Sequence, residues 1–192
     1  NKLWVKDRVI EVSGVGYMPV GDFTIDDEPL QLGETKSLDK LLEIAALCNG
    51  AKVDPPSDRN RNWSVIGDPT DGALLVAALK YGQVIDEIVN EKPTIDILPF
   101  SFERKRMSTV HEYKDEIYVY TKGAPRNILD LCNRILVEDK EEPLTQETLD
   151  WVETRIHEFA NEGLRVIAMA YRSLPKAEYR KGEGLEEELV FV

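Results

Sequence analysis

Three neighbouring segments between residues 94 and 122 constrain the fold most strongly, because each has the composition of a β-strand. They cover residues 94–100, 105–113 and 116–122, and only Lys114 and Asp115 separate the second from the third. Two polar residues between runs rich in β-branched and aromatic side chains are typical of a tight turn. The second and third segments are therefore predicted to form an antiparallel hairpin.

Helical patterns alternate with further strand-like segments along the rest of the chain. In residues 37–49, Leu38, Leu41 and Leu42 recur at the spacing of one helix face, and Ser37 is the expected N-cap. The other helices are expected within residues 67–82, 84–90, 124–132 and 145–162, and further strands at 3–12, 164–171 and 189–192.

The remaining segments lack periodicity. Residues 21–35 are expected to be a loop or a poor hairpin, 51–62 an exposed loop and 173–188 irregular. A hairpin accompanied by helices and other strands indicates an α+β fold, in which an antiparallel β-sheet is flanked by α-helices. The chain is expected to be a single domain over residues 1–192. Because both ends look like interrupted strands, this domain is expected to be excised from a larger protein.

The composition argues against several classes of protein. The formal net charge is −12, from 24 Lys and Arg against 36 Asp and Glu, which argues against a general nucleic-acid binder. A bilayer-spanning helix needs a run of about 18 apolar residues, and the sequence has none. The histidines and cysteines are too scattered to suggest a metal site, so none is predicted.

One short segment, FSFERKRMSTV at residues 100–110, reverses the acidic character of the chain locally. If a strand begins at Lys105, then Lys105, Met107 and Thr109 share one face and Arg106 lies on the other. The aromatic face of Phe100 with an ammonium group nearby fits a flat, anionic ligand such as a nucleotide. The alternative is a hairpin edge whose charges prevent aggregation, and local features alone favour that alternative.

A second segment, TKGAPRNIL at residues 121–129, joins an expected strand to an expected helix. Gly123 lets a ligand approach the backbone closely, and the free amides at a helix start attract anions. Lys122 adds a full positive charge. The segment is not a P-loop, since GxxxxGK[ST] is absent. An ordinary strand-to-helix turn remains the alternative.

Asp71 and Arg165 are further candidates. Asp71 lies in GDPTDGALL, where it either stabilises a helix start or accepts a hydrogen bond from an exocyclic amine. Arg165 lies in the mostly apolar LRVIAMAY, so it is expected to reach the strand end or a salt-bridge partner. No catalytic residue is predicted, because Ser108 and His111 lack a third group that would orient the base.

Four segments, taken in order along the chain, resemble the nucleotide-binding domain of cation-transporting P-type ATPases, in the branch of the calcium and sodium/potassium pumps. They are GDPTDGALL, PFSFERKRMS, YTKGAPRNIL and GLRVIAMAYR. The resemblance spans nearly the whole chain, and four motifs in family order are far more specific than any one of them. It implies the α+β fold of that domain and the binding of ATP.

The resemblance also implies the roles of individual residues. Phe100 would stack on adenine, Lys105 and Lys122 would line the nucleotide pocket beside Gly123, and Arg165 would reach toward the phosphates. Arg104 and Arg106, which the resemblance leaves outside the pocket, are expected to pair with surface acids or to help docking with a phosphorylated domain.

Two positions depart from the family pattern. Asp71 would lie near the adenine amino group, but the family usually has glutamate there, and aspartate is one methylene shorter. Phe102 stands where calcium pumps can carry a basic residue that helps hold phosphate. The adenine contact of Asp71 is therefore the least secure of these assignments.

The resemblance implies an enzyme of which this chain is one part. The whole pump would couple hydrolysis of ATP, with Mg²⁺, to ion movement through an aspartyl-phosphate, and calcium is the first choice of ion. The phosphorylated aspartate lies in a DKTGT motif that this sequence does not contain, so no turnover by this chain is expected.

The expected partners are ATP and the phosphorylation and actuator domains of the same pump. The chain is expected to be a monomer and the cytoplasmic domain of an integral membrane protein, without nucleic acid or direct membrane contact. Two alternatives remain: a protein-interaction module of the same fold that has lost nucleotide binding, and a nucleic-acid module that uses the aromatic-basic strand.

Overall fold

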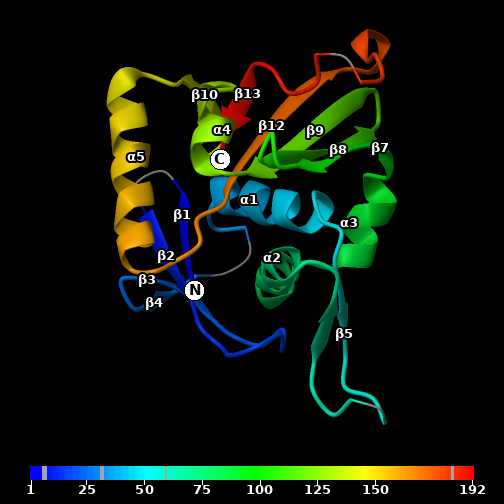
Figure 1. The fold of residues 1–192 in the computed structure, drawn as a ribbon, viewed down its shortest axis with the longest axis vertical. Helices are drawn as coiled ribbons and strands as arrows, with labels where there is room; N and C mark the ends of the chain where they lie inside the picture. The colour runs from blue at the N-terminus through cyan, green and yellow to red at the C-terminus, as the bar shows by residue number, and fades with distance from the viewer. Residues whose placement is uncertain (6–7, 31–32, 59, 183) are drawn as a thin grey trace. The chain divides into compact units, whose positions relative to one another are not determined.

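The computed structural model describes residues 1–5, 8–30, 33–58, 60–182 and 184–192. These residues fall into two compact units, 1–91 and 92–192, and each unit is considered by itself (Figure 1). The prediction of a single domain over residues 1–192 stays a prediction. Among the described residues, no helix has both the length and the apolar composition needed to cross a membrane.

The first unit begins with a small antiparallel sheet whose strands follow each other in chain order. The strands are β1 (Lys2–Val5), β2 (Arg8–Val12), β3 (Phe23–Ile25) and β4 (Glu28–Pro29). The single strand predicted over residues 3–12 is wrong, since β1 and β2 pair antiparallel with Leu3 opposite Ile10. Alternating apolar residues run through both strands, so the pattern does not mark the reversal; Lys6 and Asp7 lie outside the described residues.

The poor hairpin expected as one alternative within residues 21–35 is confirmed. β3 and β4 pair with Ile25 opposite Glu28. Between them, Asp26 and Asp27 have φ angles of 50° and 67°. Two successive left-handed residues are typical of the tight turn that joins hairpin strands, and aspartate tolerates this conformation better than most residues.

Three helices of the first unit are described, at α1 (Lys36–Leu47), α2 (Pro69–Lys80) and α3 (Ile85–Glu91). The predicted apolar face of α1 is confirmed, because Leu38, Leu41 and Leu42 are buried. The prediction that Ser37 is the N-cap is wrong. The helix begins at Lys36 with Thr35 in the cap position, and Ser37 is buried in the first turn. In α2, Asp68 is the cap, and its carboxylate accepts from the amides of Thr70 and Asp71.

The exposed loop predicted over residues 51–62 is partly wrong. Residues 52–54 form β5 (Lys52–Asp54), which pairs antiparallel with β6 (Ser64–Ile66). Figure 1 shows this hairpin beside α2, which contacts both strands. Two short strands separated by a proline-containing segment give too few alternating residues for the pattern to be recognised.

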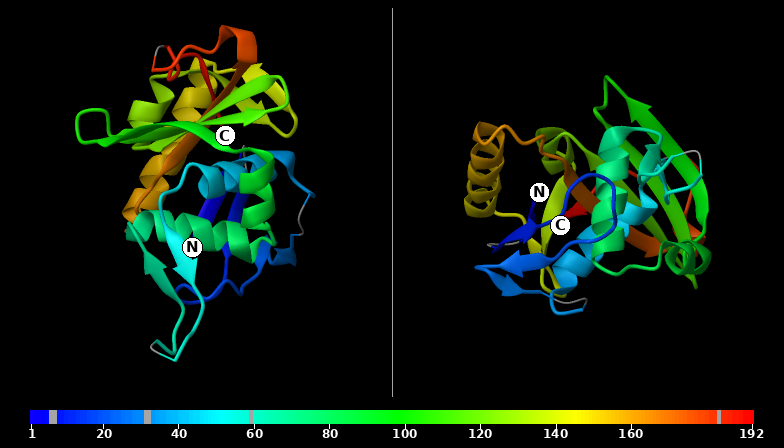
Figure 2. Two further views of the ribbon diagram at one scale, coloured as in Figure 1. Left: turned by 90° about the vertical axis from the view of Figure 1, so that its right-hand side faces the viewer. Right: turned by 90° about the horizontal axis from the view of Figure 1, so that it is seen from below.

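The second unit is built on a large sheet. Its described strands are β7 (Thr94–Ser101), β8 (Arg106–Tyr113), β9 (Glu116–Gly123), β10 (Cys132–Val137), β11 (Lys140–Pro143), β12 (Ala168–Pro175) and β13 (Leu189–Phe191), in the order β11-β10-β13-β12-β9-β8-β7. The β10–β13 pair is parallel, and the other described neighbours are antiparallel. The predicted α+β class with an antiparallel sheet is confirmed. The green strands β7, β8 and β9 lie side by side in both views of Figure 2.

The helical segments described in the second unit are α4 (Pro125–Leu129), α5 (Gln146–Asn161) and the short 3₁₀ turn η1 (Lys176–Glu178). α4 packs against β9 and β12 of the large sheet. It ends before the predicted limit at Cys132, which instead begins β10. The predicted strand at 164–171 begins later, at Ala168, because residues 164–167 connect α5 to the sheet.

Register across the large sheet defines where candidate functional residues meet. Arg106 pairs with both Ser101 of β7 and Gly123 of β9, and Gly123 also pairs with Ala168 of β12. These paired residues form a row across one end of the sheet, called here the Gly123 end. Since neighbouring strands are about 4.8 Å apart, β7 and β12 are separated by roughly 14 Å at this end.

Candidate functional site

The Gly123 end of the large sheet brings together several of the residues that the sequence singled out. Phe100 is the penultimate residue of β7, and Lys105 immediately precedes β8. Gly123 is the last residue of β9, and Lys122 precedes it. Their predicted roles toward a ligand stay predictions.

Lys105 lies in the turn between β7 and β8, not in a strand as predicted. Its φ angle is 52°, a left-handed conformation that is uncommon for a residue with a long side chain. Two backbone hydrogen bonds hold it: its amide donates to the Ser101 carbonyl at 2.8 Å, and its carbonyl accepts from the Ala124 amide at 3.0 Å. One hydrogen bond within the turn and one from the start of α4 therefore hold this conformation.

Gly123 is required by the same contact. A Cβ atom at this position would lie 2.4 Å from the carbonyl oxygen of Lys105 and 2.7 Å from the Cβ of Arg106. Real Cβ atoms do not come this close to a backbone oxygen, so glycine lets the turn before β8 pack on the end of β9. The structure thus explains Gly123 by close approach of the protein's own backbone, which fixes Lys105 beside the start of α4.

Phe100 presents an aromatic surface at this end of the sheet. It is 54% exposed, and its ring meets the ring of Phe102 edge to face, with centroids 5.6 Å apart and planes at 82°. The pairing of β7 with β8 is irregular between Leu98 and Ser101, so Phe100 lies at a bulge in an edge strand. Bulges commonly redirect a side chain near a functional site.

Lys122 is nearly buried, with 6% of its surface exposed. It pairs with Met107 on β8 and Met169 on β12. Successive side chains of a strand point to opposite faces, so Lys122 lies on the face opposite to its neighbour Thr121. The side chain of Lys122 is thus largely shielded from water, and in such surroundings the attraction between opposite charges is strong.

Arg165 is exposed and lies in the segment that connects α5 to β12. The expectation that it lies in a strand is wrong, because β12 begins three residues later at Ala168. Ala168 is paired with Gly123, so the connecting segment leads into the Gly123 end of the sheet. Because Arg165 is exposed, it does not carry the cost of a buried charge that its apolar neighbours suggested.

Asp71 lies in the first unit, in the first turn of α2. Its carboxylate accepts a hydrogen bond from the Gly50 amide at 3.0 Å, and its carbonyl accepts from the Asn49 side chain at 2.9 Å. These contacts join the start of α2 to the segment after α1. Asp71 therefore has a structural role of its own within the first unit, and its predicted adenine contact stays a prediction.

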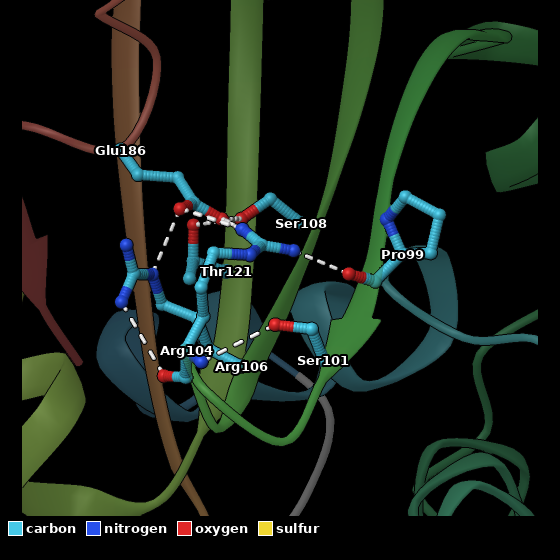
Figure 3. A network of polar contacts seen from close by, with 7 residues as sticks. All are labelled: Pro99, Ser101, Arg104, Arg106, Ser108, Thr121 and Glu186. Atoms are coloured by element: carbon cyan, nitrogen blue, oxygen red, sulfur yellow. Dashed lines mark hydrogen bonds and ion pairs between the residues drawn. The ribbon is translucent and has the colours of Figure 1, made fainter.

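The two arginines on either side of Lys105 converge on one carboxylate, that of Glu186 (Figure 3). Arg104 donates to both oxygens at 2.7 and 2.8 Å, and Arg106 donates through Nε at 2.8 Å. Ser108 donates at 2.6 Å and also bonds the Thr121 hydroxyl at 2.8 Å. The expected pairing of the arginines with acids is thus confirmed, but the acid is not on the open surface, since its side chain is only 9% exposed.

The ionised form of Glu186 is favoured in this setting. Burial raises the pKa of its carboxyl group, but hydrogen bonds from Ser108, Arg104 and Arg106 outweigh burial and hold the pKa below its ordinary value of 4.5. Sequence reasoning missed Glu186, which lies about 80 residues from its partners in an acidic, irregular segment. The one available signal was the run of three cations in an acidic chain, which needs a counter-charge.

The arrangement suits binding better than covalent chemistry. Ser108 donates to Glu186, whereas the ring nitrogens of His111 contact the Lys92 carbonyl and the Thr109 hydroxyl. These two residues therefore do not form a nucleophile and base. In the part of the chain that the structure describes, no group of three or more His, Cys, Asp or Glu residues is placed to hold a metal ion. An exposed aromatic ring and lysines at the same end of a sheet can together hold a flat anion.

The chain is similar to proteins of known family. The family model described as P-type ATPase, cytoplasmic domain N, matches residues 37–192. A calcium-transporting ATPase of Bacillus subtilis (strain 168) is 31% identical over 191 residues, which cover 99% of this chain and 21% of that protein. A calcium-transporting ATPase of Bacillus cereus (strain ATCC 10987 / NRS 248) is 36% identical over 152 residues, which cover 79% of this chain and 16% of that protein.

A cation-transporting ATPase of Synechocystis is 31% identical over 189 residues, covering 95% of this chain and 20% of that protein. The chain thus spans about a fifth, or somewhat less, of the length of these curated relatives. The matched residues include the start of α2 and all described strands of the large sheet. The chain belongs to the family of P-type ATPase cytoplasmic N domains.

Proposed function

We propose that this chain binds ATP at the Gly123 end of the large sheet and positions it for phosphoryl transfer to an aspartate in a separate domain. Phe100 stacks on adenine, Lys105 and Lys122 line the nucleotide pocket beside Gly123, and Arg165 reaches toward the phosphates.

The observation that carries this proposal is the fixed turn before β8. Gly123 admits the Lys105 carbonyl at a distance that any other residue would forbid, and the turn is further tied by the Ser101 and Ala124 hydrogen bonds. A site fixed in advance loses less conformational entropy when a ligand binds. The same turn begins two residues after Phe100, whose side chain is exposed, and ends at Lys105.

The whole protein is proposed to be a membrane-bound cation pump with this chain as a cytoplasmic domain. Calcium is the proposed ion, because two of the relatives quoted above are named calcium-transporting ATPases. Its proposed partners are ATP, with Mg²⁺ in the full pump, and the phosphorylation and actuator domains of the same chain. The N domain itself is proposed to act as a monomer without nucleic acid or membrane contact.

Titration of the isotope-labelled chain with ATP, followed by amide NMR shifts, tests the proposal. Saturable shifts clustered at residues 100–106 and 122–124 are expected. A dissociation constant of about 0.1 to 1 mM is expected for a domain without its partners, equivalent to roughly −4 to −6 kcal/mol. Absence of shifts at several millimolar ATP would contradict the proposal and favour the protein-interaction module. In the same samples, no release of inorganic phosphate is expected.

A further inference from the structure

We propose that Glu186 is a positioning residue for the nucleotide site: its carboxylate holds Arg104 and Arg106, and thereby holds the end of β7 with Phe100 and the turn with Lys105. The inference rests on the proposed binding of ATP and adds to it a residue about 80 positions away in the sequence. Glu186 itself is not proposed to touch the nucleotide.

The first step of the argument is the number of contacts that one carboxylate makes. Both oxygens accept from Arg104, Oε2 also accepts from Arg106, and Oε1 also accepts from Ser108. Hydrogen bonds in which both partners are charged are shorter and stronger than neutral ones, and a side chain held by several of them has a fixed position. Figure 3 shows the three donors around Glu186.

The second step follows these arginines into the turn. Arg104 also donates to the Pro99 carbonyl, and its amide donates to the Ser101 hydroxyl at 3.2 Å. Arg106 donates to the Arg104 carbonyl at 3.3 Å. The guanidinium groups therefore connect the end of β7, the turn itself and the start of β8. Phe100 lies directly after Pro99, within the span that these contacts hold.

The third step concerns how Glu186 is itself held. Its neighbour Leu185 is 4% exposed and packs with Val110, Ile117 and Val119. Arg172 of β12 donates to the Gly184 carbonyl at 2.9 Å and to the Glu187 carbonyl at 3.1 Å. Neither anchor involves the turn before β8, so the carboxylate is fixed to the large sheet independently of the turn.

The fourth step is the face of the sheet on which the carboxylate lies. Ser108 and Thr121 are cross-strand partners, and both belong to the face that Glu186 covers. Lys122 and Met107 are the next pair, so their side chains belong to the opposite face. Glu186 therefore lies across the sheet from Lys122 and does not contact a ligand that Lys122 holds, so apart from its charge it acts on that ligand through the turn.

When Glu186 is neutralised, a purely electrostatic effect and a loss of positioning change the affinity for ATP in opposite directions. Removing a negative charge near a site for a polyanion would by itself tighten ATP and leave uncharged adenosine unaffected. Loosening the turn would displace both Phe100 and Lys105, so both ATP and adenosine would bind more weakly. The two ligands together separate these effects.

The experiment compares Glu186→Gln with Glu187→Gln, which removes the same charge from the adjacent, exposed glutamate. Amide NMR titrations of the folded chain with ATP and with adenosine give both affinities, at a temperature well below thermal unfolding of each variant. For Glu186→Gln we expect about tenfold weaker binding of both ligands, and for Glu187→Gln less than about a twofold change. Without ligand, Glu186→Gln should shift the amides of residues 100–106, and Glu187→Gln should not.

Two further variants keep the test decisive if Glu186→Gln does not fold. Glu186→Asp retains the charge on a shorter side chain and should recover part of the affinity for both ligands. Ser108→Ala removes one donor to the carboxylate and should weaken both ligands about two- to threefold, with shifts at residues 100–106.

Each remaining outcome overturns a specific statement. If Glu186→Gln binds ATP more tightly and adenosine with unchanged affinity, or if its affinities equal those of Glu187→Gln, the positioning role is overturned. Either result leaves the proposed ATP site intact. Failure of the unmodified chain to bind ATP would instead overturn the proposed function. The two failures are distinguished by the unmodified chain alone.

Discussion

The backbone carbonyl of Lys105 packs against Gly123 so closely that an added Cβ would lie 2.4 Å from the oxygen. This contact joins a left-handed residue of one turn to the last residue of a neighbouring strand. It also places the Lys105 carbonyl within 3.0 Å of the Ala124 amide at the start of α4. One glycine therefore sets the position of the whole Gly123 end of the sheet.

Gly123→Ala should consequently damage both folding and binding. The new methyl group must displace backbone atoms, not the tip of a flexible side chain, so we expect a loss of about 1–3 kcal/mol in the free energy of unfolding. ATP affinity of the remaining folded protein should fall because Lys105 moves. Urea unfolding and ATP titration measure the two effects.

Gly50→Ala is a suitable control for this substitution. A Cβ at Gly50 would meet only the Asp71 carboxylate oxygen at 3.7 Å, an ordinary contact. A change within about 0.5 kcal/mol is expected. Equal stability losses for both variants would show that the close approach at Gly123 has no special weight.

Phe100→Ala should weaken ATP binding more than it lowers stability. The ring is 54% exposed, so little buried surface is lost, whereas stacking of a base on an aromatic ring contributes about 1–3 kcal/mol. Phe102→Ala, at an 85% exposed ring on the same turn, serves as the control and should reduce affinity less. A collapse of the melting temperature with unchanged affinity would make Phe100 a core residue instead.

Lys122→Met should separate charge from packing at the buried lysine. Methionine keeps most of the volume of the side chain in its 6% exposed position but removes the ammonium group. We expect a larger loss of affinity for ATP than for adenosine, because only ATP carries phosphates. Equal losses for the two ligands would remove the phosphate role of Lys122.

Acid should weaken the contribution of Glu186 to stability. Because hydrogen bonds from Ser108, Arg104 and Arg106 hold its folded-state pKa below the ordinary value of 4.5, the unfolded chain binds its proton more readily. The stabilisation is therefore fully present above about pH 5 and is lost as pH falls through 4.5 toward the folded-state pKa. Unfolding of the unmodified chain and of Glu186→Gln, measured between pH 7 and 3, should give free energies that converge as pH falls. A constant or growing difference would contradict the lowered pKa.

Local patterns predicted much of the second unit because its hairpin and its α5 helix are specified by neighbouring residues. The break at Lys114 and Asp115 separates two alternating runs, and β8 and β9 form as predicted with Tyr113 opposite Glu116. Thr145 caps α5 through its side chain, which accepts from the Thr148 amide. Such signals lie within a few residues of the structure that they specify.

Features set by distant contacts could not be predicted in this way. Lysine has no preference for a left-handed conformation, so nothing local indicates that Lys105 adopts one. Glu186 is one of many acidic residues, and only the fold selects it as the partner of Arg104 and Arg106. The sequence also does not indicate that the chain reverses direction within residues 3–12, because alternating apolar residues run through both paired strands.

The most direct measurement is a search for nuclear Overhauser contacts between adenine protons and phenylalanine rings in the ATP-saturated chain. The sequence contains five phenylalanines, so selective labelling with Phe100→Leu as the reference assigns the ring that is contacted. The account predicts contacts from adenine H2 or H8 to Phe100, which disappear in the reference. Contacts to another ring, or their persistence in Phe100→Leu, would contradict the placement of ATP at the Gly123 end.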